Sequence, residues 1–92
     1  MSDKQIFVTV SGVDKVGIVA KVSTALADLQ VNIEDIKQTI MQGHFVMFLL
    51  GDITNSKYSF SEIKDNLVKI GNDLNMEIWV QKKEIFDKMH NI

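Results

Sequence analysis

The sequence contains neither cysteine nor proline among its 92 residues. Without cysteine, the chain has no disulfide framework, no thiolate zinc site and no cysteine nucleophile. Without proline, the ends of its helices must be set by glycine, by capping side chains and by changes in the hydrophobic pattern. No apolar run approaches the roughly 18–20 residues that a membrane-spanning helix needs. We therefore expect no membrane partner.

Arginine is also missing, since all ten basic residues are lysine. Arginine is the usual bidentate ligand of phosphate and carboxylate and a frequent reader of nucleic-acid bases. The formal net charge is −2, and no block of basic residues is present. Because affinity for nucleic acid depends largely on neutralising phosphates, we expect no nucleic-acid partner. Small acyl-phosphate hydrolases hold phosphate with an arginine, so this composition also argues against that class of enzyme.

The residues that are present form an ordinary globular composition. Hydrophobic residues make up 46% of the chain, which argues against disorder. The amino-terminal segment MSDKQ has neither the basic nor the apolar region of a signal peptide. We expect a single cytoplasmic domain over residues 1–92, with its core at about 5–82 and a tail at 83–92.

Alternation of side chains predicts the first and last strands. Residues 5–11 alternate between apolar and other side chains. Residues 76–81 alternate in the same way, and Trp79 shares a face with Glu77 and Gln81.

Two further strands are predicted to form a hairpin. Residues 32–40 are rich in β-branched side chains but broken by charged ones, which is typical of an edge strand that must avoid unwanted pairing. Residues 45–53 are apolar at both alternating sets of positions, which predicts a central strand covered on both faces. The intervening sequence MQGH, at 41–44, supplies a glycine for the turn.

Helical spacing appears in two segments. The first helix begins at Ile18 and ends near Leu29, with apolar residues on one face. The second begins after Ser59, because Glu62 follows at capping-box spacing. Gly71 lies inside this helix at a cost of about 1 kcal/mol relative to alanine, so we expect its last turn to fray. The tail EIFDKMHNI predicts a short terminal helix.

The resulting order is β-α-β-β-α-β. Right-handed crossovers convert this order into an α+β fold, the ferredoxin-like plait, with one four-stranded antiparallel sheet and two helices on one of its faces. This fold by itself decides no function.

The loop between the first strand and the first helix has features that suit the binding of an anion. The first N–H groups of a helix lack internal partners and carry the positive end of the dipole, which suits a carboxylate. Gly17 would let a ligand approach the backbone closely. On geometry alone a plain turn is the better interpretation, because two glycines are a weak motif.

The stretch VSGVDKVGIVAKVSTALADLQVNIEDIKQTI resembles the first half of an ACT domain, the small-molecule-sensing module of amino-acid metabolism. The matching features are the strand, Asp14 with Gly17-Ile18-Val19 at the helix start, and Asn32-Ile33 at the next strand. The chain is most similar to small stand-alone ACT proteins of bacteria and archaea, which are themselves similar to the repeats of the glycine cleavage system repressor. The resemblance covers roughly residues 5–82, and the tail also looks like the ending of that subgroup.

The resemblance implies a regulatory domain, not an enzyme, that binds an amino acid at a homodimer interface. The implied site consists of Asp14, Gly17, Ile18 and Asn32, with no catalytic residue, metal or cofactor. The N–H groups of Gly17 and Ile18 would hold the ligand carboxylate, and the Asn32 amide can both donate and accept. Asp14 would meet the ammonium group or cap the helix. We expect no attached catalytic or DNA-binding domain, so the sequence does not indicate which partner is regulated.

Two other functions compete with this interpretation. An RNA-recognition module has the same plait, and IFV at 6–8 and GHFVMF at 43–48 resemble its two signatures. Its stacking platforms would be Phe7, Phe45 or Phe48, and Trp79. The acidic balance places this alternative second.

An enzyme would have to pair His44 or His90, the only histidines, with Asp52 or Asp87. A surface or interface histidine is the better interpretation, because only a cluster of pocket residues supports catalysis.

We also expect a homodimer. Phe7, Trp79 and one alternating set from residues 45–50 would form an apolar sheet face opposite the helices, and such a surface usually marks an interface. The edge strand at 32–40 offers a second route by extension of the sheet. A tail folded over the open face, with Ile85, Phe86 and Met89, is the alternative cover.

Overall fold

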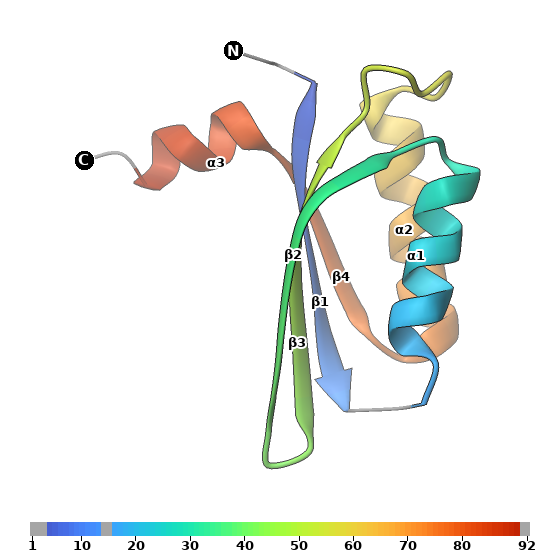
Figure 1. Cartoon of the computed structure of the whole chain (residues 1–92), viewed down its shortest axis with the longest axis vertical. Coiled ribbons are helices and arrows are strands. Elements are labelled where there is room, and N and C mark those ends of the chain that lie inside the picture. The colour runs from blue at the N-terminus through green and yellow to red at the C-terminus, as the bar shows by residue number, and fades with distance from the viewer. Residues whose placement is uncertain (1–3, 14–15, 91–92) are drawn as a thin grey trace.

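The computed structural model describes residues 4–13 and 16–90, the side chains of Phe86, Met89 and His90 apart. Its elements are β1 (Gln5–Val13), α1 (Ile18–Asp28), β2 (Asn32–Met41), β3 (His44–Asp52), α2 (Phe60–Leu74), β4 (Glu77–Lys82) and α3 (Lys83–His90). Figure 1 shows the sheet edge-on, with α1 and α2 together on one side. The predicted order of strands and helices is confirmed.

The sheet has the strand order β2-β3-β1-β4, and every neighbouring pair is antiparallel. This is the ferredoxin-like plait predicted from the sequence. β2 is an edge strand, as expected, and its register with β3 shifts between Ile33 and Asp35. β4 is the other edge. Among the described residues, no helix is both long enough and apolar enough to cross a membrane.

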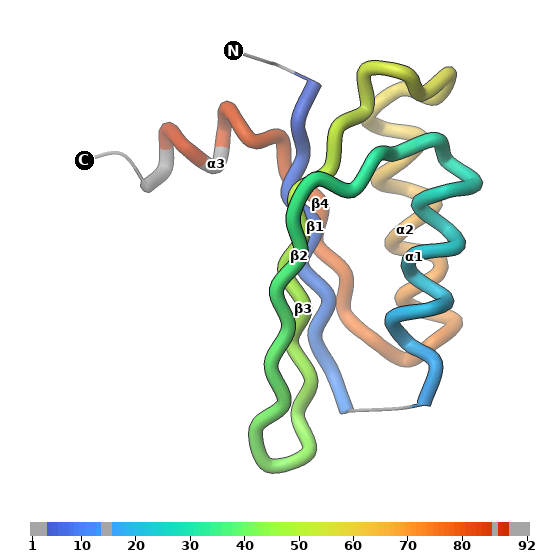
Figure 2. The backbone as a smooth tube through the Cα atoms, viewed as in Figure 1, coloured from blue at the N-terminus to red at the C-terminus, as the bar shows by residue number. Residues whose placement is uncertain are grey.

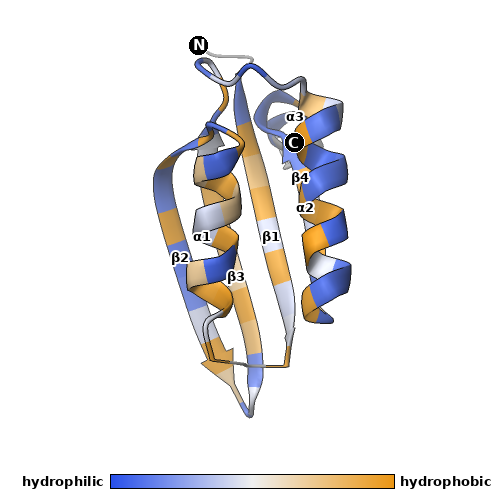
Figure 3. Ribbon diagram, turned by 90° about the vertical axis from the view of Figure 1, so that its right-hand side faces the viewer, coloured by the Kyte–Doolittle hydropathy of each residue, from blue (hydrophilic) through white to orange (hydrophobic). Residues whose placement is uncertain are grey.

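The core lies between the helices and one face of the sheet. Figure 3 shows the alternation of apolar and polar residues along the strands beneath α1 and α2. The fully buried side chains of this layer include Ile6, Val8, Val10, Met47 and Leu49 from the strands and Val22, Leu26, Ile63 and Leu67 from the helices. No polar or charged residue of the described chain is buried. The predicted helical faces therefore pack as expected.

Within the described residues, the opposite face of the sheet carries no helical layer above β3, contrary to the expectation that this strand is covered on both faces. Val46, Phe48 and Leu50 point to that face and are only half-buried. Part of this burial comes from a neighbour in the same sheet, because the rings of Phe7 and Phe48 stack with their centroids 4.9 Å apart and an angle of 13° between them. Cross-strand contacts thus contribute to the burial of an apolar strand.

Phe45 does not belong to this open face. It points toward the helices and is 3% exposed, so it cannot serve as the stacking platform that the RNA-recognition alternative allowed. Residues on one strand face alternate, and Phe45 and Phe48 therefore lie on opposite faces.

The terminal helix α3 leaves the sheet on the side opposite α1 and α2, and it points away from the strands (Figure 2). A hollow on the open face is lined by Phe7, Phe48, Leu50 and two charged residues of β2, and no residue of α3 takes part. Of the three residues expected to cover this face, Ile85 is half exposed, and the side chains of Phe86 and Met89 lie outside the described residues. Within α3, Lys83 and Asp87 form an ion pair one helical turn apart.

Gly71 has a packing role that the sequence did not indicate. The last turn of α2 is intact and ends at Asn75, which adopts the left-handed conformation at φ 58°. Gly71 is buried against β4, and a Cβ atom there would lie 2.9 Å from the Met76 carbonyl oxygen and 2.9 Å from Ile78 Cγ1. The glycine lets α2 approach the sheet, and the expected fraying is wrong because packing outweighs the low helix propensity.

We predict that Gly71→Ala destabilises the protein by about 1–2 kcal/mol. The added methyl group should gain about 1 kcal/mol of helix propensity, but it overpacks against a backbone atom that cannot move aside. The measurement is the urea midpoint of unfolding, with Asp73→Ala on the exposed side of α2 as the control. A Gly71→Ala protein as stable as the wild type would show that the close approach is not needed.

Candidate functional site

Among the described residues, no side chain caps the amino-terminal end of α1 as Ser59 caps that of α2. In α2, the Ser59 hydroxyl accepts a hydrogen bond from the Glu62 N–H, and the Glu62 carboxylate accepts one from the Ser59 N–H. In α1 the N-cap is Gly17, which has no side chain, and the first turn contains no acidic residue. The positive end of the α1 dipole is therefore not compensated from within the helix.

Gly17 adopts the left-handed conformation, with φ 84° and ψ 5°. A Cβ atom at this position would meet nothing within 4 Å among the described atoms, so the backbone is open to an approaching group. Positive φ is a conformation that glycine tolerates without steric cost. The turn itself therefore requires glycine here, as the interpretation of this loop as a plain turn expects. The open approach to the backbone is also compatible with a loop that binds a carboxylate.

Ile18 belongs to the core through its side chain, which is buried beneath α1. Only its backbone N–H, in the first turn of the helix, can serve a ligand. Asp14 lies outside the described residues.

Asn32 lies beyond the other end of α1. It is exposed at the start of β2, whereas Gly17 precedes the first residue of α1. The helix between them has 11 residues and is therefore about 16 Å long. The two predicted site residues are not brought together within one copy of the chain.

The register of the sheet places Asp52 opposite Asn32, a neighbour that the sequence did not indicate. Hydrogen bonds from the Thr54 hydroxyl and the Thr54 N–H lower the pKa of the Asp52 carboxyl, so this group is ionised at neutral pH. The Thr54 N–H lies 2.7 Å from Oδ1. The Asn32 amide and the Asp52 carboxylate are neighbours because the register between β2 and β3 shifts between Ile33 and Asp35. No pattern in the sequence indicates this shift.

His44 forms neither of the pairings considered for an enzyme, and the side chain of His90 lies outside the described residues. His44 lies at the opposite end of β3 from Asp52, about 26 Å away along the strand. Its Nε2 atom lies 2.9 Å from the Ser11 hydroxyl oxygen. Asp87 forms an ion pair with Lys83.

An exposed apolar strip follows β2 on the helix side of the sheet. Ile36 pairs in register with Leu49, and Ile40 pairs with Phe45, so both point to the same side as the buried core. They are nevertheless 40% and 57% exposed. Apolar side chains that leave the core at the sheet edge in this way suggest a contact with another molecule.

Residues 4–81 match the family model described as the ACT domain. The chain belongs to the ACT domain family. A UPF0237 protein of Listeria monocytogenes is 48% identical over 84 residues, which cover 91% of this chain and 94% of that protein. The structure of an ACT domain protein from Streptococcus pneumoniae has a TM-score of 0.80 at 36% identity, and the match covers 90% of this chain and 93% of the other.

The ACT fold also appears in a larger solved structure described as a glycine cleavage system transcriptional repressor, with a TM-score of 0.76. That match covers 85% of this chain and 44% of the repressor, and at 18% identity it shows the fold alone. The resemblance inferred from the sequence is confirmed. ACT domains are regulatory ligand-binding domains, and this chain is a member.

We predict different costs for two substitutions of Gly17. Gly17→Val should lower the free energy of unfolding by about 1–2 kcal/mol, because a β-branched residue resists positive φ. Gly17→Asp should cost less, since aspartate tolerates this conformation and a carboxylate at a helix amino terminus is favourable by about 0.3–1 kcal/mol. Chemical denaturation of both variants provides the comparison. Equal stability of Gly17→Val and wild type would mean that residue 17 is not held at positive φ.

Proposed function

We propose that this ACT protein is a cytoplasmic amino-acid sensor whose ligand binds between two copies of the chain. The observation that carries the proposal is the position of the two candidate ligand groups at opposite ends of α1. One end offers backbone N–H groups at Gly17 and Ile18. The other offers the Asn32 amide beside the Asp52 carboxylate. Neither end holds both halves of a site for a zwitterion.

A two-fold axis perpendicular to α1 would complete the site. Such an axis runs the two α1 helices antiparallel, so the amino-terminal end of each helix lies near the carboxyl-terminal end of the other. Gly17 of one copy would then approach Asn32 of its partner. One symmetric dimer contains two such sites, and each site uses residues from both copies.

The chemistry of the two ends suits an α-amino acid. The N–H groups at the start of α1 would bind the carboxylate, as helix amino termini do with anions. The Asn32 amide oxygen and the ionised Asp52 would accept hydrogen bonds from the ammonium group. Asp14 would be a further acceptor or would cap the helix. These groups would recognise the carboxylate and ammonium groups of the ligand. The surface of the partner copy would select its side chain.

The exposed strip of Ile36 and Ile40 supports a dimer contact on the helix side of β2. It lies on the helix side of β2, where Ile36 and Ile40 pair in register with Leu49 and Phe45. The bulge and the charged residues of β2 disfavour an extended edge-to-edge sheet, so burial of the two isoleucines would contribute more than strand pairing. A dimer of this kind would use the edge strand β2 without extending the sheet, and so differs from both routes expected from the sequence.

Regulation would follow from the shared site. A ligand held by both copies binds the dimer and not the separate chains, so it stabilises the dimer by mass action. The concentration of the amino acid is thereby coupled to the assembly state, which is an allosteric signal that a partner protein can recognise. No catalytic group or cofactor takes part in this scheme.

We predict that at least one common amino acid raises the melting temperature of the protein, and that Asn32→Ala weakens its binding. Loss of the amide should cost about 0.5–3 kcal/mol, which is roughly a two- to 150-fold loss of affinity. The ligand is first found by thermal shift against the common amino acids and is then titrated by calorimetry.

Lys69→Ala, an exposed position on α2, is the control variant for this titration. If an amino acid binds and Asn32→Ala retains the affinity of Lys69→Ala, then Asn32 is not part of the site.

A further inference from the structure

A cavity of about 320 Å³ lies at the end of the sheet where β1 begins, β3 ends and β4 joins α3. Figure 1 shows these segments and the loop from β3 to α2 at the same end of the molecule. The loop, residues 53–59, supplies most of the lining, and Phe60 at the start of α2 completes that wall. This volume is at the lower end of the range for pockets that bind small molecules.

Two lysine side chains from neighbouring strands meet at this cavity, which we call the lysine cavity. Lys4, just before β1, and Lys82, the last residue of β4, both line it. Ile6 pairs in register with Lys82, so Lys4, two residues before Ile6, shares the helix side of the sheet with Lys82. Diagonal neighbours of this kind have Cα atoms about 7–8 Å apart. One anion can therefore contact both ammonium groups.

Positive charge predominates in the lysine cavity, although the whole chain has a net charge of −2. Of the residues that line it, Lys4 and Lys82 are basic and only Glu84 is acidic. Within the described chain, no carboxylate forms an ion pair with Lys82. Its ammonium group lies 5.3 Å from the centroid of the Phe60 ring. Because an aromatic ring has no net charge, this contact leaves the charge of Lys82 uncompensated.

Hydrogen bonds fix the loop wall of the lysine cavity without a ligand. The Ser56 hydroxyl donates to the Leu29 carbonyl oxygen at 2.6 Å. The Lys57 N–H donates to the side-chain oxygen of Gln30 at 2.9 Å. Both contacts join the loop to the segment that follows α1. A ligand thus meets a wall that is already formed, which lowers the entropic cost of binding.

The same wall offers a hydroxyl donor and apolar surface. The Ser59 hydroxyl oxygen accepts a hydrogen bond from the Glu62 N–H, and a hydroxyl group that accepts can still donate its own proton. The capping box already satisfies the start of α2, so the lysines, and not the helix dipole, would attract the anion. Ile53 and Phe60 supply the apolar part of the lining.

We propose that the lysine cavity binds a small organic phosphate, with Lys4 and Lys82 on the phosphate group and Ile53 and Phe60 against the organic part. A phosphate monoester carries about −1.5 to −2 charges at pH 7, which matches two ammonium groups, whereas a carboxylate matches one. Lysine binds phosphate as a point charge and needs no arginine beside it. Glu84, which is exposed on α3, opposes the anion by repulsion.

The lysine cavity is separate from the proposed amino-acid site. Its lining belongs to a single copy of the chain, and neither Asn32 nor Asp52 is part of it. An organic phosphate should therefore bind Asn32→Ala as tightly as the wild type. Failure of either proposal leaves the other measurable.

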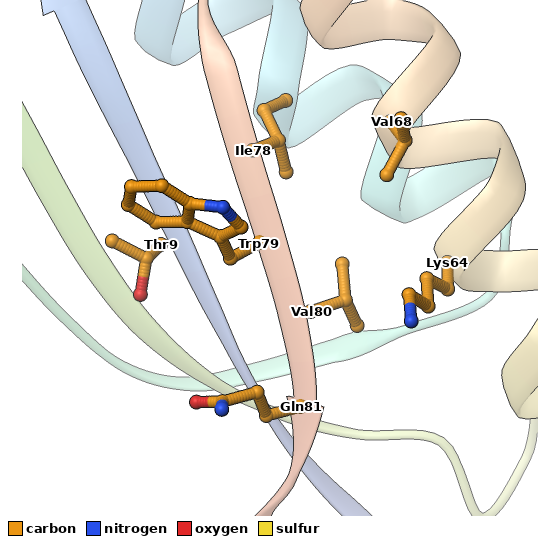
Figure 4. Close-up of a pocket in the computed structure, with 7 residues that line it drawn as sticks. All are labelled: Thr9, Lys64, Val68, Ile78, Trp79, Val80 and Gln81. Atoms are coloured by element: carbon orange, nitrogen blue, oxygen red, sulfur yellow. The ribbon is translucent and has the colours of Figure 1, made fainter.

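A second cavity provides a matched control variant. It lies between α2 and β4, has a volume of about 500 Å³, and contains Lys64 as the only charged side chain among the residues that line it (Figure 4). Lys64→Gln changes the net charge of the protein as Lys82→Gln does, but it leaves the lysine cavity intact.

Titration with phenyl phosphate at constant ionic strength, followed by the amide NMR spectrum of the labelled protein, tests the proposal. We expect saturable shifts centred on residues 53–60 and Lys82, and no comparable shifts with sodium acetate. Inorganic phosphate should shift the same amides but bind at least about threefold more weakly, because it has no apolar part to bury. Equal affinities of the two phosphates would overturn the assignment of the apolar wall.

Substitutions then locate the charges. Lys4→Gln and Lys82→Gln should each weaken the binding of phenyl phosphate about fivefold, and Glu84→Gln should strengthen it about twofold. Lys64→Gln should bind as the wild type does, and the same spectra show whether each variant is folded. The proposal is overturned if phenyl phosphate shifts the amides no more than acetate does, or if both Lys4→Gln and Lys82→Gln retain the affinity of Lys64→Gln.

Discussion

The structure depends on the packing of both helices against the same face of the sheet. The two right-handed crossovers require this arrangement, and it gathers the buried apolar residues into one layer that contains no buried polar group. A domain of this size buries only a small apolar area, so its stability depends on close packing of the helices against the sheet. Gly71 allows α2 to lie directly on β4. The same one-sided layer leaves the opposite face and both sheet edges exposed, which makes contacts with other molecules the natural use of this fold.

The direction of α1 limits how a ligand can bind, because the two candidate ligand groups lie at its opposite ends. The helix separates its amino terminus at Gly17 from the polar pair at Asn32 and Asp52. A ligand with two opposite charges close together cannot bridge about 16 Å. In the proposed dimer, a second copy in antiparallel orientation would remove the separation. The proposed sensor thus needs the dimer for its chemistry, and not only for its stability.

The sequence was sufficient for the fold because its local signals agree with one another. Alternation located the strands, Ser59 and Glu62 marked the start of α2, and the family motif identified the ACT domain. It was not sufficient for features that arise between elements. Gly71 looked unfavourable because its contact with Met76 is made only in the folded chain. The pairing of Asn32 with Asp52 depends on a register shift, and the shelter of Phe48 depends on its stacking with Phe7 across the strands.

The central claim, a ligand site shared by two copies, is tested most directly by mixing two defective chains. Gly17→Asp places a negative charge where the carboxylate should bind, and Asn32→Ala removes the amide on the other side. Each variant alone should bind the amino acid weakly or not at all. After unfolding and refolding together, mixed dimers hold one intact site, and calorimetry should recover about a quarter of the wild-type number of tight sites. No recovery in the mixture, with mixed dimers present, would contradict a site built from both copies.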